Sequence, residues 1–173
     1  MPSDSSPVLQ AFDPSLMAVV NEVAEQLLRR RQRLCTAESC TGGLIAAHCT
    51  ELAGSSEWFD RGYVTYSNAA KHEALQVPEV LIERHGAVSQ EVALAMAIGA
   101  RSVSRTDWSI AVTGVAGPTG GSAEKPVGTV WLAWAGPQGV LQAEHHFFVP
   151  GNRQHIRLNS VQVALRQLLQ FLQ

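Results

Sequence analysis

The stretch Thr36–Gly43 contains the residue types of an acyl-transfer site. It places a hydroxyl at Ser39 and a thiol at Cys40, between a short strand-like run and a segment with the composition of a buried helix. We interpret it as a strand, a sharp turn and a helix N-terminus, where free backbone N–H groups can stabilise an oxyanion or a phosphate. Ser39 is therefore a candidate nucleophile. The alternative is that Ser39 only caps the helix, which is the ordinary use of serine at such a position.

Tyr66 and Lys71 lie five residues apart across a predicted strand–helix junction, close enough for the phenol and the ammonium to share a site. A lysine acts as a general base toward serine only when its amine is neutral, which requires burial or nearby positive charge to lower its pKa from about 10.4. A neighbouring tyrosine would then pass a proton or hold the amine. No lysine stands at Ser-x-x-Lys spacing after Ser39, so tertiary contact would have to bring the two together. The alternative is an exposed lysine on a helix.

Glycine is concentrated between residues 113 and 122, a segment too rich in Gly and Pro to be helix or strand. It matches neither G-x-G-x-x-G nor the Walker pattern, so what remains is a loop whose N–H groups can approach a ligand, or a long surface turn. Arg153 opens the last predicted helix, where a bound phosphate would explain a cation at the end that favours anions. Lys125 is a weaker candidate for binding the phosphate, because it is placed in a loop. The predicted substrate-binding residues are Thr113, Gly114, Gly117, Gly120, Gly121 and Arg153.

Cysteine and histidine do not form a metal-binding pattern. Cys35, Cys40 and Cys49 are odd in number and lack paired zinc spacing, which fits reduced thiols. His145 and His146 are adjacent in a predicted strand and so point to opposite faces. We expect no structural metal.

The elements that must position these residues alternate between strand and helix, which predicts an α/β fold: a single-domain three-layer α/β/α sandwich. A hairpin around Gly136–Gly139 makes the sheet mixed. Asp13 and Pro14 form a good helix opening, and Trp58 and Phe59 are expected to anchor a loop in the core. We expect strands at 34–37, 61–66, 108–112, 128–135 and 140–149, and helices at 14–31, from 44, from 68, 78–85, 89–102 and 153–172.

The composition is that of one globular domain. Hydrophobic residues make up 46% and charged residues 16% of the 173, which argues against disorder. The net charge of −2 provides no basic surface for nucleic acid, and no apolar run is long enough to span a membrane. The polar N-terminus lacks a signal peptide's apolar region, so we expect a soluble cytoplasmic protein. Residues 1–10 are predicted to be a flexible tail and 11–173 the domain.

Five motifs in order extend these observations over nearly the whole chain. TAESCTGG at 36–43, YSNAAK at 66–71, GAVS at 86–89, TGVAGP at 113–118 and KPVGTV at 125–130 closely resemble the CinA C-terminal domain family, in its stand-alone form. Two positions depart from the usual motifs: Asn152 stands where Asp is commoner, and Ala69 where Glu is commoner.

The resemblance implies a nicotinamide-nucleotide amidase, which hydrolyses the carboxamide of nicotinamide mononucleotide to the nicotinic acid nucleotide and ammonia for NAD recycling. It implies Ser39 as nucleophile and Lys71 and Tyr66 as the catalytic lysine and tyrosine. The N–H groups of Cys40, Thr41 and Gly42 would form the oxyanion hole. No metal or organic cofactor, no nucleic acid and no membrane partner is implied. Whether the protein forms a homo-oligomer is left undecided.

Two other functions remain as alternatives. One is a reductase with a Tyr/Lys pair, but the pair here does not have Tyr-x-x-x-Lys spacing and no dinucleotide fingerprint accompanies it. The other is a non-catalytic nucleotide-binding or competence-related interaction protein, which the family's association with DNA uptake suggests. The lack of a basic face counts against direct DNA binding.

Overall fold

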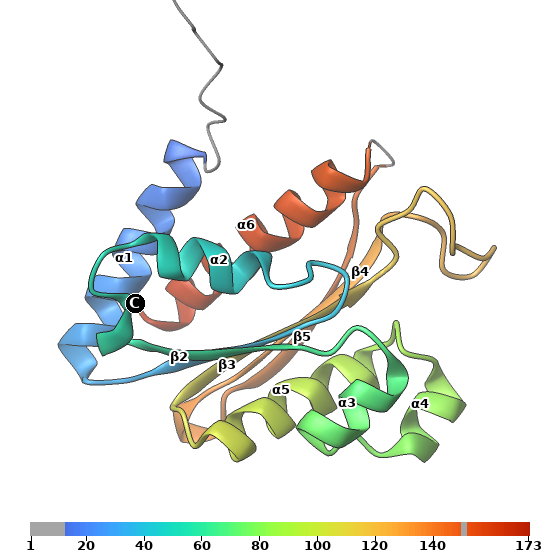
Figure 1. The fold of residues 1–173 in the computed structure, drawn as a ribbon, viewed down its shortest axis with the longest axis horizontal. Helices are drawn as coiled ribbons and strands as arrows, with labels where there is room; N and C mark the ends of the chain where they lie inside the picture. Colours follow the sequence, from blue (N-terminus) through green and yellow to red (C-terminus); the bar gives the residue numbers. More distant parts are fainter. Residues whose placement is uncertain (1–12, 150–151) are drawn as a thin grey trace, which may run out of the picture.

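A five-stranded mixed sheet separates two layers of helices in the computed structural model, which describes residues 13–149 and 152–173 (Figure 1). The predicted tail at 1–10 lies outside these residues, and so do residues 150–151, which follow the predicted last strand. The strand order is β2-β1-β3-β4-β5, with β2, β1 and β3 parallel and β4 and β5 joined on by antiparallel pairing. The strands are β1 Leu34–Glu38, β2 Phe59–Val64, β3 Trp108–Gly114, β4 Thr129–Ala135 and β5 Leu141–Phe147.

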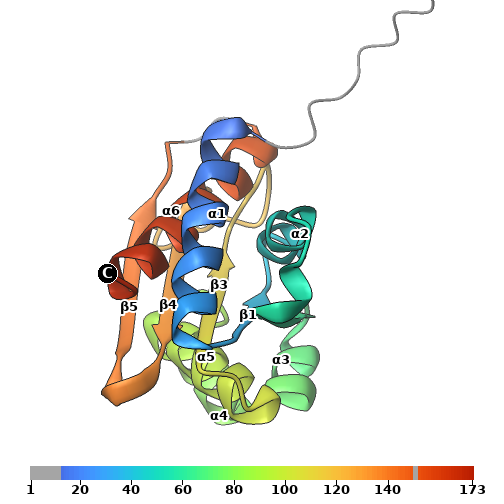
Figure 2. The ribbon, with the colours of Figure 1, turned by 90° about the vertical axis from the view of Figure 1, so that its left-hand side faces the viewer.

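Three helices cover each face of this sheet, as the three-layer prediction requires (Figure 1). Figure 2 shows α1 and α6 packed side by side on one face. That layer consists of α1 Pro14–Arg30, α2 Leu44–Glu51 and α6 Arg153–Phe171, and the other of α3 Asn68–Leu75, α4 Glu79–His85 and α5 Gln90–Ser104.

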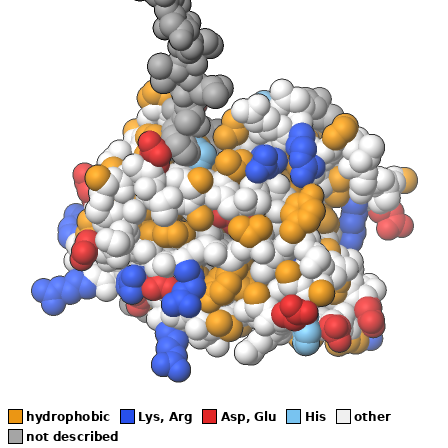
Figure 3. Space-filling model, viewed as in Figure 1, with side chains coloured by type: hydrophobic (Ala, Val, Ile, Leu, Met, Phe, Trp, Pro, Cys, Tyr) orange, Lys and Arg blue, Asp and Glu red, His pale blue; other side chains and the backbone are white. Residues whose placement is uncertain are grey.

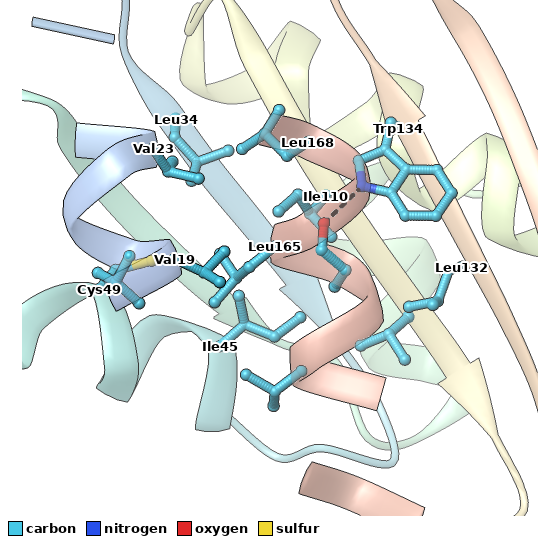
Figure 4. Packing of buried hydrophobic residues seen from close by; sticks show 14 of the residues in the cluster. Val19, Val23, Leu34, Ile45, Cys49, Ile110, Leu132, Trp134, Leu165 and Leu168 are labelled. Atoms are coloured by element: carbon cyan, nitrogen blue, oxygen red, sulfur yellow. Dashed lines mark hydrogen bonds between the residues drawn. The ribbon is translucent and has the colours of Figure 1, made fainter. Parts of the chain in front are cut away.

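The alternation of side chains along the strands builds two different cores. On the α1, α2 and α6 face the side chains are large, and Trp134 Nε1 donates to the Ala164 carbonyl at 3.0 Å within this cluster (Figure 4). On the other face small residues of the sheet meet the small residues of α5, so that helix packs closely. Gly99 is required there, because a Cβ would lie 1.9 Å from the Leu75 carbonyl oxygen of α3.

The topology gathers the loops of interest at one edge. The β1–β2 connection crosses one face through α2, whereas the β2–β3 connection returns over the other face through α3, α4 and α5. The connection that leaves β1 and the connection that enters the neighbouring strand β3 therefore lie on opposite faces of the sheet, which makes the space between β1 and β3 a topological switch point. The carboxyl ends of the three parallel strands share one edge of the sheet. Such a switch point is the usual ligand site of open α/β sheets.

Several predicted boundaries differ from the structure. The second strand begins at Phe59 and ends at Val64, so Thr65 and Tyr66 leave it earlier than predicted and turn toward α3. Trp58 and Phe59 are buried in the core on the α1, α2 and α6 face, as expected. The helix opening at Asp13 is confirmed, since its carboxylate accepts from the Ser15 N–H at 2.7 Å.

Candidate active site

The site begins with the alternation of β1, which sends consecutive side chains to opposite faces. Leu34 lies in the α1, α2 and α6 core, while Cys35 and Ala37 lie in the α5 core. By the same alternation Glu38 contacts α2, and Ser39, the next residue, contacts α3. Ser39 also stays tied to the sheet, because its N–H donates to the Val112 carbonyl of β3 at 3.0 Å.

Glu38, and not Ser39, caps α2. The N-cap residue of that helix is Gly43, which has φ 95° and no side-chain cap of its own. The fully buried Glu38 carboxylate takes that role with five hydrogen bonds. Its donors are the N–H groups of Gly43, Ile45 and Ala46 at 2.9–3.0 Å and the hydroxyls of Thr36 and Thr41 at 3.1 and 2.7 Å. The interpretation of Ser39 as a cap is therefore wrong, and the first N–H groups of α2 are not free for an oxyanion.

Ser39 instead faces a buried amine. Lys71 Nζ lies 3.1 Å from Ser39 Oγ and donates to the Thr65 and Tyr66 carbonyls at 2.9 and 3.4 Å. The Lys71 side chain is only 1% exposed, which excludes the alternative of a solvated helix lysine. Burial lowers the pKa of Lys71 from its ordinary value, against a smaller opposing effect of Cys40. In the described residues Lys71 forms no ion pair with a carboxylate that would favour its charged form.

A cavity of about 270 Å³ opens in front of this pair. It brings together most of the residues that the sequence nominated, from four separate segments. Thr41, Gly42 and Gly121 do not line it. Five residues that were not predicted as site residues do line it, and all but Thr119 belong to the motifs at 86–89 and 113–118: Ala87, Val88, Val115, Ala116 and Thr119. The nominated residues that line it are Ser39, Cys40, Tyr66, Lys71, Thr113, Gly114, Gly117, Gly120 and Arg153.

A larger cavity of about 520 Å³ lies at the opposite end of the sheet, between the end of α5 and the β4–β5 turn. Its basic side chains are Arg101 and Arg105, and none of the nominated residues lines it. We therefore take the smaller cavity, where Ser39 and Lys71 meet, as the candidate active site.

Two of the three nominated oxyanion donors remain available. The Gly42 N–H donates to the Ser39 carbonyl at 3.1 Å and so closes the turn. Within the described residues, the N–H groups of Cys40 and Thr41 donate to no other residue. The Cys40 thiol is a poor rival nucleophile, because burial raises its pKa to about 12 and the nearby Glu38 charge adds to the shift.

Tyr66 and Arg153 meet across the mouth of the cavity. Arg153 Nη2 donates to the Tyr66 hydroxyl at 3.2 Å, and Nη1 donates to the Gly117 carbonyl at 2.7 Å. Tyr66 thus contacts Lys71 through its backbone carbonyl, while its phenol, on a 63% exposed side chain, binds the arginine. The expected phenol–ammonium pair is therefore not formed. Thr113 is held at the cavity wall by its bond to the Ala87 carbonyl at 2.9 Å.

Three further residues shape the site from outside it. Lys125 Nζ donates to the His85 carbonyl at 2.6 Å and ties the glycine-rich loop to the end of α4. Arg157 Nη2 donates to the Thr41 carbonyl at 2.7 Å. Its four-residue spacing from Arg153 was a usable signal, because such residues share a helix face. Asn152, which departs from the commoner Asp, still caps α6 by accepting from the His155 N–H at 2.8 Å.

Other kinds of site find little support in the described residues. They contain no group of three or more His, Cys, Asp or Glu side chains that could hold a metal ion. No described helix is both long and apolar enough to cross a bilayer. On the face drawn in Figure 3 the basic side chains stand in separate groups, one of them with an acidic side chain among them.

The fold and the cavity together place this chain among α/β enzymes with a serine–lysine pair at the carboxyl ends of parallel strands. The model of the CinA C-terminal domain matches residues 16–172. The chain belongs to the CinA C-terminal domain family.

Curated relatives and solved structures agree with this assignment. The chain is 51% identical over 153 residues to a nicotinamide-nucleotide amidohydrolase PncC of Enterobacter agglomerans, covering 86% of this chain and 92% of the relative. It is 46% identical over 162 residues to the PncC of Escherichia coli K12, covering 93% and 98%. The crystal structure of a competence/damage inducible protein CihA from Agrobacterium tumefaciens superposes with a TM-score of 0.91 at 43% identity, covering 94% and 98%.

Proposed function

We propose that this protein hydrolyses the carboxamide of nicotinamide mononucleotide, giving nicotinic acid mononucleotide and ammonia. The observation that carries the proposal is the 3.1 Å approach of Ser39 Oγ to the buried amine of Lys71 inside the cavity. The names of the curated relatives, nicotinamide-nucleotide amidohydrolases, support the substrate.

In the first half of the proposed reaction, neutral Lys71 takes the hydroxyl proton as Ser39 Oγ attacks the carboxamide carbon. The negative charge that develops on the amide oxygen is stabilised by the free N–H groups of Cys40 and Thr41. Lys71 then gives its proton to the departing nitrogen, so that the C–N bond breaks, ammonia leaves and an ester to Ser39 remains.

The second half of the reaction reverses these roles with water. Lys71 removes a proton from a water molecule that attacks the ester carbon, and returns it to Ser39 Oγ as the nicotinic acid nucleotide departs. The burial that lowers the pKa of Lys71 favours this exchange, because a larger fraction of the amine is then neutral at a given pH. No metal or organic cofactor is required.

For the phosphate, the proposal assigns Arg153 and the glycine-rich loop. Arg153 lies at the cavity mouth and at the start of α6, so its guanidinium adds to the positive end of the helix. Gly114, Gly117 and Gly120 line the same wall and allow backbone N–H groups to approach an anion closely. Tyr66, whose hydroxyl contacts Arg153, is assigned to orient that guanidinium and, through its carbonyl, Lys71.

The test is ammonia release from nicotinamide mononucleotide by the purified protein and by its Ser39→Ala variant. Wild type should turn over, and the variant should lose nearly all activity while its melting temperature stays close to that of wild type, since Ser39 caps no helix. A wild-type protein that binds the nucleotide without releasing ammonia would instead indicate a non-catalytic nucleotide-binding protein. A folded Ser39→Ala variant with more than about a tenth of wild-type turnover would exclude Ser39 as the nucleophile.

A further inference from the structure

Arg157 reaches from α6 into the turn that follows β1. Its Nη2 donates to the Thr41 carbonyl oxygen at 2.7 Å, so it joins two segments that are 116 residues apart in sequence. It lies one helical turn after Arg153, but unlike Arg153 it does not line the cavity. Any effect on the reaction must therefore pass through the turn.

The Thr41–Gly42 peptide is held at both of its polar ends. Its carbonyl accepts from Arg157, and its N–H donates to the Ser39 carbonyl. Because a peptide unit is planar, these two bonds together define the orientation of its plane. The Thr41 hydroxyl adds a third anchor by donating to Glu38 at 2.7 Å.

The same bonds determine where the neighbouring N–H groups point. In a trans peptide the carbonyl and the N–H face opposite ways, so engaging the Ser39 carbonyl in the turn directs the Cys40 N–H away from it. The Cys40 and Thr41 N–H groups are those left without another partner in the described residues. Loss of the Arg157 contact would allow the Thr41–Gly42 peptide to rotate and carry the Thr41 region with it.

A purely stabilising role for Arg157 explains the contact less well. Arg157 forms no ion pair with a carboxylate in the described residues. Its Nε is buried there without a hydrogen-bond partner, which costs free energy. Such a cost is more often tolerated at functional sites than in the structural framework.

We propose that Arg157 is a positioning residue. By binding the Thr41 carbonyl, it holds the turn after β1 in the conformation that leaves the Cys40 and Thr41 N–H groups free to bind the oxyanion. This inference rests on the proposed amidase function and deepens it. Arg157 itself touches neither nucleophile nor base.

The test compares Arg157→Met, Arg157→Lys and, as a control on the same helix, the exposed Arg166→Met. We expect Arg157→Met to lower kcat about 10- to 100-fold while KM changes less than about threefold, because a misplaced turn weakens transition-state contacts more than substrate binding. Arg157→Lys should recover part of kcat, because its ammonium can still donate to a carbonyl. Arg166→Met should match wild type.

A second measurement does not depend on the amidase reaction. Hydrogen exchange of the Gly42 amide, followed by NMR, should be faster in Arg157→Met than in wild type. The reason is that the hydrogen bond from the Gly42 N–H to the Ser39 carbonyl depends on the peptide orientation that Arg157 maintains. If wild type releases no ammonia, the proposed function fails while this exchange rate still tests Arg157. If Gly42 exchange in Arg157→Met is the same as in wild type, the inference is overturned. A rise in KM at constant kcat in Arg157→Met would overturn it as well. If Arg157→Met does not fold, the same outcomes are decided on Arg157→Lys.

Discussion

Replacing Glu38 by Gln should destabilise the protein far more than a neutral isostere would at an exposed site. The two oxygens of this carboxylate are used differently: one accepts from three donors and the other from Thr36 and Ala46. A glutamine can place its carbonyl at only one of these positions. Its NH₂ group then faces donors at the other.

The expected loss follows from that geometry. With the carbonyl at the three-donor position, the Thr36 hydroxyl can rotate and accept from the new NH₂, but the Ala46 N–H is left buried without an acceptor. An unpaired buried N–H costs about 1–3 kcal/mol, and each of the three remaining bonds loses about 1 kcal/mol of charge assistance. The free energy of unfolding should therefore fall by about 4–6 kcal/mol.

Urea unfolding at neutral pH measures this loss, with the exposed Glu73→Gln on α3 as the matched control. With a slope of about 2 kcal/mol per molar, the midpoint of Glu38→Gln should fall by about 2–3 M at an unchanged slope. Glu73→Gln should stay within about 0.5 kcal/mol of wild type. A fall of less than about 1 kcal/mol for Glu38→Gln would refute the view that this carboxylate secures the start of α2.

Four further predictions concern the cavity. Because burial lowers the pKa of Lys71, kcat/KM should rise with pH and level off below the value of about 10.4 for free lysine; a flat profile from about pH 6 to 9 would count against Lys71 as the base. Between the folded and unfolded pKa values of Lys71 the unfolded chain binds more protons, so the stability of wild type relative to Lys71→Met should increase with pH through that window; urea titrations showing a constant difference would contradict this. Arg153→Ala should lower kcat/KM for nicotinamide mononucleotide by about 1.5–3 kcal/mol but leave the slow hydrolysis of the riboside unchanged, whereas equal losses on both would point to a defect in folding or catalytic geometry. Lys125→Met frees the glycine-rich loop from α4 and should raise KM about 3- to 10-fold at constant kcat, a change that steady-state kinetics would detect or exclude.

Local signals in the sequence were enough to predict the elements and their order. Capping side chains at Asp13, Ser67 and Ser89 mark helix starts that the structure has, each accepting from an N–H two or three residues on. Such signals depend on neighbouring residues, so they can be read without knowing the fold. The alternation of strand and helix likewise predicted the three layers.

Which side chains meet was decided by tertiary structure. Ser39 and Lys71 are 32 residues apart, and only the placement of β2 beside β1 brings α3 back under the serine. The same strand alternation that frees Ser39 turns Glu38 toward α2, so the capping role fell to a residue whose type gave no such hint. The Tyr66 phenol went to Arg153 because that helix end lies across the cavity mouth.

Sequence spacing is informative over about one helical turn or along one strand, because there the backbone geometry relates residue number to direction. Between elements, distance depends on strand order and on which faces pack, and these are set by burial over the whole domain. The motifs at 36–43 and 66–71 therefore named, from the sequence, residues that meet in the candidate site. The burial that lowers the pKa of Lys71, and the bond by which Arg157 holds Thr41, exist only once the sheet and both helix layers have assembled.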